Sequence, residues 1–121
     1  MRLLFTILLC ALSTAQASAQ NVASQMLLML SEGERNAAVT RLLQTSNEKC
    51  DQVTRTLFKG TALGTDDWEA LCRDRHSYSI SIPPDLNAGI ELVSCRELLA
   101  TSKMLLHRAG SKTKAVGCRI R

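Results

Sequence analysis

The stretch that decides the fold is WEALC at residues 68–72, followed by YSISIPPD at residues 78–85 and IELVSC at residues 90–95. In the second segment a tyrosine and two isoleucines alternate with serines, the period-two pattern of a strand with one buried face. A proline pair ends that segment, and short polar turns separate the three. The stretch therefore predicts consecutive strands joined by short loops, as in an antiparallel meander.

The residues just upstream add a further strand. Residues 53–58 (VTRTLF) are rich in β-branched and aromatic side chains, and Gly60 and Gly64 punctuate the loop expected after them. We therefore expect four strands, at residues 53–58, 68–73, 78–82 and 90–93.

The N-terminal part of the domain has a helical pattern. Between residues 20 and 45 there is no proline, and apolar residues recur at spacings of three and four. Gly33 interrupts the run, and Ser31 with Glu34 has capping-box spacing, so we expect two helices with a break near Ser31. The first contains MLLML at residues 26–30. A helix that is apolar nearly all round is typically buried, and the alternative is a face for a membrane surface or a partner.

A third helix is predicted near the C-terminus. Ser94 and Glu97 repeat the capping-box spacing and Gly110 follows the pattern, which indicates a helix over about residues 95–109. Apolar and basic residues alternate over residues 116–121. This end is expected to be a short edge strand or an extended tail held by Cys118.

The first residues indicate export. Arg2, the apolar run at residues 3–12 and the small-residue site at residues 17–19 are typical of a secretory signal peptide, with cleavage expected after Ala19. The run is too short to span a bilayer, which needs about 20 residues. We expect a periplasmic or secreted protein with one domain, residues 20–121, divided into a helical part (20–48), a meander (49–94), and a helix with a basic tail (95–121).

Four cysteines remain after removal of the signal peptide and of Cys10 with it. An even number in a chain of about a hundred residues bound for an oxidising compartment predicts two disulfides. A zinc site with His76 or His107 is the rival, but no Cys-x-x-Cys pair is present, so no metal is expected. The cysteines are Cys50, Cys72, Cys95 and Cys118.

Strand counting favours one pairing of these cysteines. Cys50 precedes the first strand and Cys72 ends the second, so a hairpin would bring them side by side. Cys72 and Cys95 would lie two strands apart, about 10 Å, whereas a disulfide needs Cα atoms within about 7 Å. This favours Cys50–Cys72 with Cys95–Cys118. The connectivity 50 with 95 and 72 with 118 stays open if the strand order is not a simple meander.

Several motifs occur together in one group of proteins. The chain resembles uncharacterised small exported bacterial proteins that have a cysteine ahead of a Val-x-x-Thr strand, a Trp-x-x-x-Cys strand, a Tyr-x-Ile strand and two later cysteines. The resemblance covers about residues 50–118 and supports the fold and the bridges. The group has no assigned activity, and this chain departs from it in a longer span between the last two cysteines and a more basic end. The matching residues are Cys50, Val53, Thr56, Trp68, Cys72, Tyr78, Ile80, Cys95 and Cys118.

Charge is unevenly distributed. The chain has 15 Lys and Arg and 11 Asp and Glu, yet no acidic residue follows Glu97. Such an asymmetry can bind anionic surfaces, although a solvated helix face with a soluble tail also explains it. The basic segment has no aromatic residue, which argues against nucleic-acid binding. Its cations are Lys103, Arg108, Lys112, Lys114, Arg119 and Arg121.

The middle of the chain holds the other candidates for a site. Trp68, the only tryptophan, is interpreted as a core anchor or, with Tyr78, as an exposed contact for a partner. Asp66, Asp67 and Glu69 could gather a cation, but they lack the spacing of a calcium loop, so a solvated loop is expected.

Neither histidine indicates catalysis. His76 is flanked by Asp74 and Tyr78, but the segment is expected to be a tight turn, where Asp and His are common for backbone reasons. His107 near a helix C-terminus is explained by the helix dipole. No catalytic residue and no cofactor are expected.

The sequence predicts a noncatalytic α+β domain that binds an unidentified protein or envelope component. The first alternative is an envelope-associated protein that contacts an anionic membrane surface through its basic C-terminus and its apolar N-terminal helix. The second is a small hydrolase or redox enzyme. The sequence does not indicate an oligomeric state.

Overall fold

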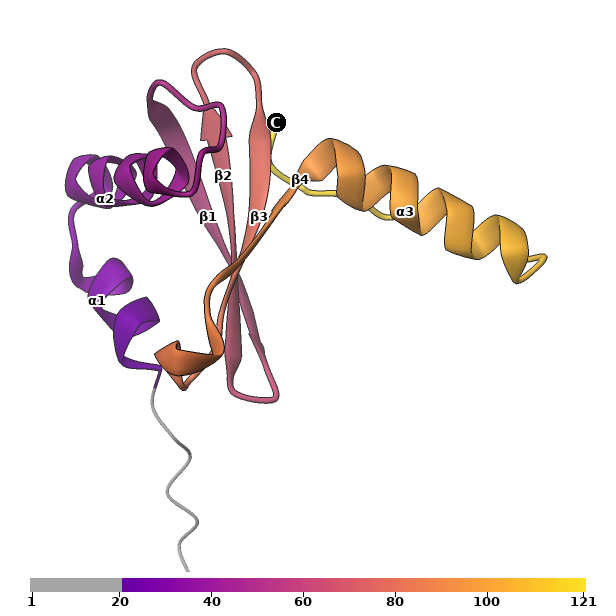
Figure 1. Ribbon diagram of the computed structural model, residues 1–121, viewed down its shortest axis with the longest axis horizontal. Helices are drawn as coiled ribbons and strands as arrows, with labels where there is room; N and C mark the ends of the chain where they lie inside the picture. The colour runs from indigo at the N-terminus through magenta and orange to yellow at the C-terminus, as the bar shows by residue number, and fades with distance from the viewer. Residues whose placement is uncertain (1–20) are drawn as a thin grey trace, which may run out of the picture.

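The computed structural model describes residues 21–121, which form three α-helices, a short 3-10 helix and a four-stranded sheet (Figure 1). The predicted signal peptide, residues 1–19, lies outside the described residues. The α+β class expected from the sequence is confirmed. In chain order the elements are α1 (Val22–Met29), α2 (Glu32–Thr45), β1 (Val53–Ala62), β2 (Thr65–Cys72), β3 (Ser77–Ile82), η1 (Leu86–Ala88), β4 (Glu91–Ser94) and α3 (Cys95–Arg108).

The sheet is an antiparallel meander in the order β1-β2-β3-β4. Trp68 of β2 lies opposite Ile80 of β3, which lies opposite Leu92 of β4. Directly opposed residues point to the same face, so this face carries the core. Tyr78, Ile80 and Ile82 are all buried, which confirms the predicted alternation.

The β1–β2 hairpin is longer than the sequence predicted. Residues expected to form a loop continue as paired strands as far as Ala62 and Thr65. The two-residue turn between them has φ 52° at Leu63 and 79° at Gly64, a geometry that matches the twist of a hairpin. Gly60 lies beside a register shift in β1 with φ 131°, so this glycine marks a bulge inside the strand.

The break between α1 and α2 is where the capping signal predicts it. The Ser31 hydroxyl accepts the Glu34 N–H at 3.3 Å, and the Glu34 carboxylate accepts the Ser31 N–H at 3.0 Å, which completes the capping box. Arg35 then reaches back to the end of α1, donating to the carbonyls of Leu27 at 2.8 Å and Leu30 at 2.9 Å. The same few residues therefore cap the start of α2 and provide hydrogen-bond donors for the free carbonyl groups at the end of α1.

The core lies between the sheet and α1 with α2. Trp68 is 2% exposed, and its indole N–H donates to the buried Ser24 hydroxyl of α1 at 2.9 Å. Val39 and Leu43 of α2 join it in the core. Tyr78 is also 2% exposed, with its hydroxyl donating to the Lys49 carbonyl at 2.9 Å. Both side chains belong to the core, as the core-anchor interpretation of Trp68 expects, so neither is exposed in the way that the alternative contact role requires.

Helix α1 differs from the expectation of a buried segment. Its only buried residue is Ser24, whereas Met26 is 63% and Met29 85% exposed. Ala23 and Leu27 make the contact with the core. Two turns of helix can pack only one side against the sheet, so the remaining apolar side chains face outward.

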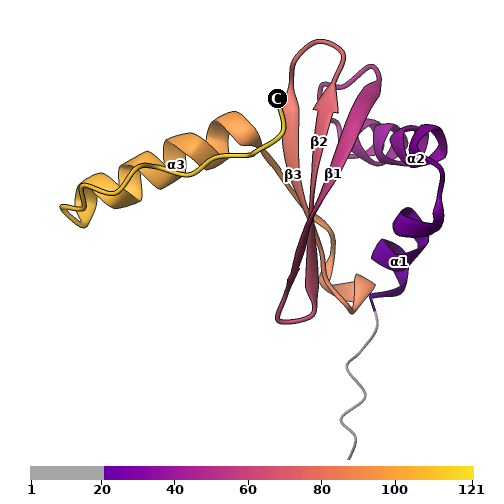
Figure 2. The same cartoon turned by 180° about the vertical axis from the view of Figure 1, so that it is seen from behind.

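The two disulfides join Cys50 with Cys72 and Cys95 with Cys118, with Cα separations of 5.6 and 5.5 Å. These are the pairs favoured by strand counting. The last segment forms no strand; residues 109–121 instead run back beside α3 as an extended tail (Figure 2).

Candidate functional site

Helix α3 leaves the edge of the sheet and projects away from the body of the molecule (Figures 1 and 2). No residue of α3 is buried. Ser94 caps its first turn by accepting the Glu97 N–H at 3.1 Å. We call α3 together with residues 109–121 the arm. The arm lies on the opposite side of the sheet from α1 and α2, so its surface is separate from theirs.

The tail is attached to α3 at three successive levels. Cys118 bonds to Cys95, the Gly117 backbone approaches Leu99, and the Val116 N–H donates to the Ser102 hydroxyl at 3.2 Å. The tail therefore runs antiparallel to the helix. A Cβ built on Gly117 would lie 3.4 Å from the Leu99 side chain, an ordinary van der Waals distance, which shows how closely the tail lies against the helix.

The end of the tail is held by Glu69, which is fully buried on β2. Its carboxylate accepts the N–H of Arg119 at 2.9 Å and that of Ile120 at 2.8 Å, and lies 3.0 Å from the Lys59 ammonium. Burial raises the pKa of this carboxyl, but the two N–H donors and Lys59 together bring the pKa below its usual value. Glu69 is therefore the anchor of the tail.

The acidic cluster is consequently not the solvated loop that was expected. Asp66, Asp67 and Glu69 all lie in β2, and Asp66 is only 5% exposed. Thr61 donates to Asp66, and Ser81 donates to Asp67 at 2.6 Å. The alternation of β2 places Asp66 on one face of the sheet and Asp67 with Glu69 on the other, and each of the three carboxylates has its own partner.

A groove of about 580 Å³ runs between α3 and the tail, and we call it the basic groove. Its wall on the helix carries Arg96 and Lys103, and its wall on the tail carries Lys114 and Arg121. No acidic residue lines it. The remaining lining residues are small, apolar or uncharged: Ser77, Cys95, Leu99, Ala115, Gly117, Cys118 and Ile120.

The cations of the basic groove are not neutralised within the described residues. The ion pairs found there join Lys59 with Glu69, Arg73 with Asp51, and His76 with Asp74. None includes a residue of the basic groove. Four like charges around a concave surface produce a positive potential that attracts anions.

The structure separates the six predicted cations into two groups. Lys103, Lys114 and Arg121 line the basic groove, whereas Arg108, Lys112 and Arg119 lie on the arm outside it. Arg96 also lines the groove but was not among the predicted residues, because the charge count began after Glu97. Its spacing of seven residues from Lys103, which places both on one helix face, could have indicated it.

His76 and Asp74 form a surface pair in the β2–β3 turn. The two side chains approach at 2.8 Å, with 52% and 40% exposed, and Asp74 also accepts the His76 N–H at 3.0 Å. The pKa of Asp74 is lowered, mainly by this backbone hydrogen bond. The contacts are those of an Asp that organises a turn, so the turn itself accounts for the pair.

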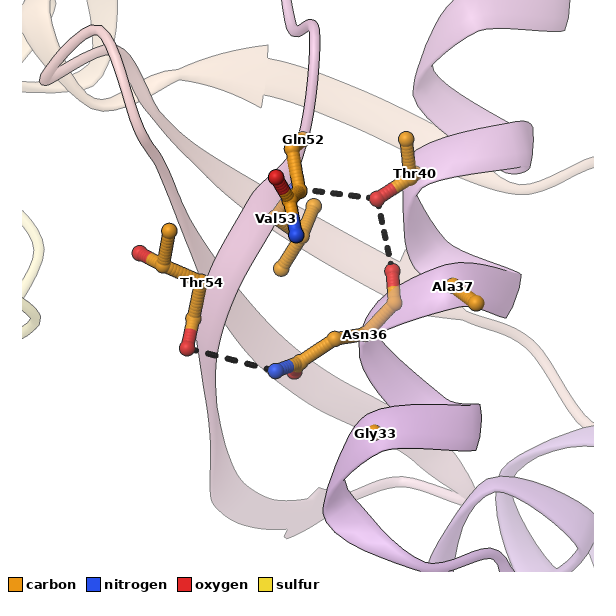
Figure 3. A pocket seen from close by; sticks show the side chains of 7 residues that line it. All are labelled: Gly33, Asn36, Ala37, Thr40, Gln52, Val53 and Thr54. Atoms are coloured by element: carbon orange, nitrogen blue, oxygen red, sulfur yellow. Dashed lines mark hydrogen bonds between the residues drawn. The ribbon is translucent and has the colours of Figure 1, made fainter.

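A second pocket lies where α2 meets the free edge of β1 (Figure 3). Asn36 donates to the Thr54 carbonyl at 3.2 Å, and Thr40 accepts the Val53 N–H at 2.9 Å. The side chains of α2 thus form hydrogen bonds with main-chain groups at the start of β1 that have no strand partner on that edge. The Asn36 Oδ1 is buried without a partner among the described residues.

Comparison with known proteins finds no matching family model, curated protein or solved structure. The resemblance to small exported proteins thus rests on its motifs alone. Within residues 21–121, no helix has the length and apolar character needed to cross a bilayer. The same residues contain no cluster of three or more His, Cys, Asp or Glu able to hold a metal ion. Two disulfides are typical of proteins in oxidising compartments.

Proposed function

We propose that this protein is an exported, noncatalytic binding domain whose arm engages an anionic partner. The observation that carries the proposal is the basic groove, where four cations from two segments face one cavity with no acidic residue among them. The signal-peptide pattern and the two disulfides support action in the periplasm or outside the cell.

Division of the molecule into a body and an arm supports a binding role. One disulfide links the two ends of the β1–β2 hairpin, and the other links the tail to the start of α3 within the arm. The hydrophobic core is confined to the sheet and α1 with α2. The arm adds little to that core. A projecting, charged element on a rigid scaffold is an arrangement that presents a surface to a partner.

The proposal is tested by measuring the binding of the disulfide-bonded chain to polyglutamate and to phosphatidylglycerol vesicles over a series of salt concentrations. We expect binding that weakens as salt rises, and loss of binding when Lys103, Arg108, Lys112 and Lys114 are all replaced by Gln. The proposal would be refuted if the affinity changed neither with salt concentration nor with these replacements.

A membrane-surface role remains the second proposal, and the exposed apolar residues of α1 favour it. Val22, Met26 and Met29 are each more than 60% exposed. They lie across the sheet from the arm, so α1 and the arm do not form one continuous surface (Figure 1). Co-sedimentation of the double variant Met26→Gln/Met29→Gln with phosphatidylglycerol vesicles tests this role, which predicts weaker association than for the unchanged chain.

A further inference from the structure

We infer that the basic groove takes an acidic polypeptide segment in an extended conformation, an inference that rests on the proposed function and names its partner class. Anionic lipid is the competing class. The shape of the groove, the positions of its cations and the state of the tail backbone distinguish the two.

The cations occupy two facing walls. Arg96 and Lys103 stand on α3, separated by seven residues or about 10.5 Å of helix rise. Lys114 and Arg121 stand on the antiparallel tail. Because the tail contacts run from Val116 beside Ser102 to Cys118 at Cys95, Lys114 lies toward the Lys103 end and Arg121 toward the Arg96 end. A linear ligand between the walls meets positive charge on both sides, whereas a flat bilayer would meet one side of the arm.

The spacing fits an extended chain. A strand advances about 3.3 Å per residue, so side chains three residues apart are separated by about 10 Å and point to opposite sides. One carboxylate can therefore reach Arg96 on the helix wall while the other reaches Lys114 on the tail wall. Between them, Leu99 and the backbone at Gly117 offer a surface without charge for a small apolar side chain.

The backbone of the tail is also available for pairing. In the described structure, residues 112–121 make no hydrogen bond between their main-chain groups and the main chain of any other residue. Val116, Arg119 and Ile120 use their N–H groups on side chains of the body and α3. Extended peptides commonly bind through main-chain hydrogen bonds, as when they add a strand to a sheet edge, and the extended tail offers main-chain donors and acceptors that could pair with a peptide in this way, whereas lipid head groups have no peptide backbone.

The probe is a twelve-residue peptide of four Glu-Val-Thr repeats, with a fluorescent label, titrated with the disulfide-bonded chain at physiological ionic strength. The variant Lys103→Gln/Lys114→Gln should weaken binding about three- to thirtyfold, the loss expected for two partly exposed ion pairs. The matched control Arg108→Gln/Lys112→Gln removes the same charge from residues that do not line the groove, and it should weaken binding clearly less than the groove variant because these side chains do not contact a peptide held there. Both pairs are exposed, so circular dichroism should show an unchanged fold.

Two further probes separate the outcomes. A peptide of the same composition with its four glutamates at one end should bind more weakly than the repeat. If the two double variants lose affinity equally, or if the two peptides bind equally well, the groove is not the peptide site. Either result would overturn this inference but leave the proposed function standing. Binding to phosphatidylglycerol vesicles without binding to the repeat peptide would overturn it in favour of lipid. Failure of every anionic probe, polyglutamate included, would overturn both.

Discussion

Replacing Glu69 by Gln should release the end of the tail and destabilise the protein. The carboxylate accepts two main-chain N–H groups, from Arg119 and Ile120, and pairs with Lys59 at 3.0 Å. One carboxylate oxygen accepts both N–H groups, so glutamine can keep these bonds in a weaker, uncharged form, but its NH₂ group then faces the Lys59 ammonium. Charge-assisted hydrogen bonds contribute about 1.5–3 kcal/mol each, and some are retained, so we expect a loss of about 2–3 kcal/mol. For a domain of this size that lowers the melting temperature by on the order of 10 °C or more.

The effect should depend on pH in a defined direction. The pKa of Glu69 is lower in the folded chain than its ordinary value of 4.5, so its stabilisation is present above that value and is lost as the pH falls through the folded pKa. The difference in unfolding free energy between the unchanged chain and Glu69→Gln should therefore be full at neutral pH and shrink in acid. Urea unfolding at several pH values measures it.

Amide hydrogen exchange locates the effect. Arg119 and Ile120 should lose protection in Glu69→Gln, while residues of the β2–β3 ladder keep theirs. Glu91→Gln is the matched control, because Glu91 is exposed on β4. It should change stability by less than about 0.5 kcal/mol. An unchanged unfolding free energy for Glu69→Gln, with the same acid dependence and the same protection of the tail, would refute the anchoring role.

Three further substitutions test the scaffold by urea unfolding. Replacing Cys50 and Cys72 together by Ser should cost about 3 kcal/mol, since the bond closes a loop of 22 residues, and an unchanged midpoint would contradict this. Trp68→Phe should lower the free energy of unfolding by about 2–3 kcal/mol because it leaves the Ser24 hydroxyl buried without its hydrogen-bond partner. Adding Ser24→Ala should recover part of that loss. If it recovers none, the loss comes from side-chain packing alone and not from the hydrogen bond. Ser31→Ala should cost about 1 kcal/mol through the lost cap of α2, with a loss near zero as the contrary result.

The framework of the fold was predictable because its signals are local. Alternation over residues 78–82 and the capping-box spacing at Ser31 and Ser94 depend on neighbours in sequence, and they placed the third strand and both helix starts; the full capping box forms at Ser31, whereas Ser94 acts as an N-cap. The disulfide pairs followed from the meander, since adjacent strands bring Cys50 beside Cys72. The hairpin turn at Leu63 was missed because a leucine in a left-handed conformation gives no turn signal.

The candidate site was only partly predictable because it depends on contacts between distant segments. Charge counting found Lys103 and Lys114 but could not show that the tail folds back to make them face each other. Glu69 was missed as an anchor because its partners lie 50 and 51 residues away. The exposure of Met29 was missed because periodicity does not say how much of an apolar helix the sheet can cover.

The order of the disulfides has a consequence for biogenesis. The first described cysteine bonds to the second and the third to the fourth, so the two loops neither overlap nor cross. Four cysteines allow three connectivities, and only this one forms when each cysteine joins the next to appear. Under the export that we propose, a chain translocated N-terminus first can therefore be oxidised correctly in order of emergence. Its maturation should need a thiol oxidase but no isomerase to rearrange mispaired bonds.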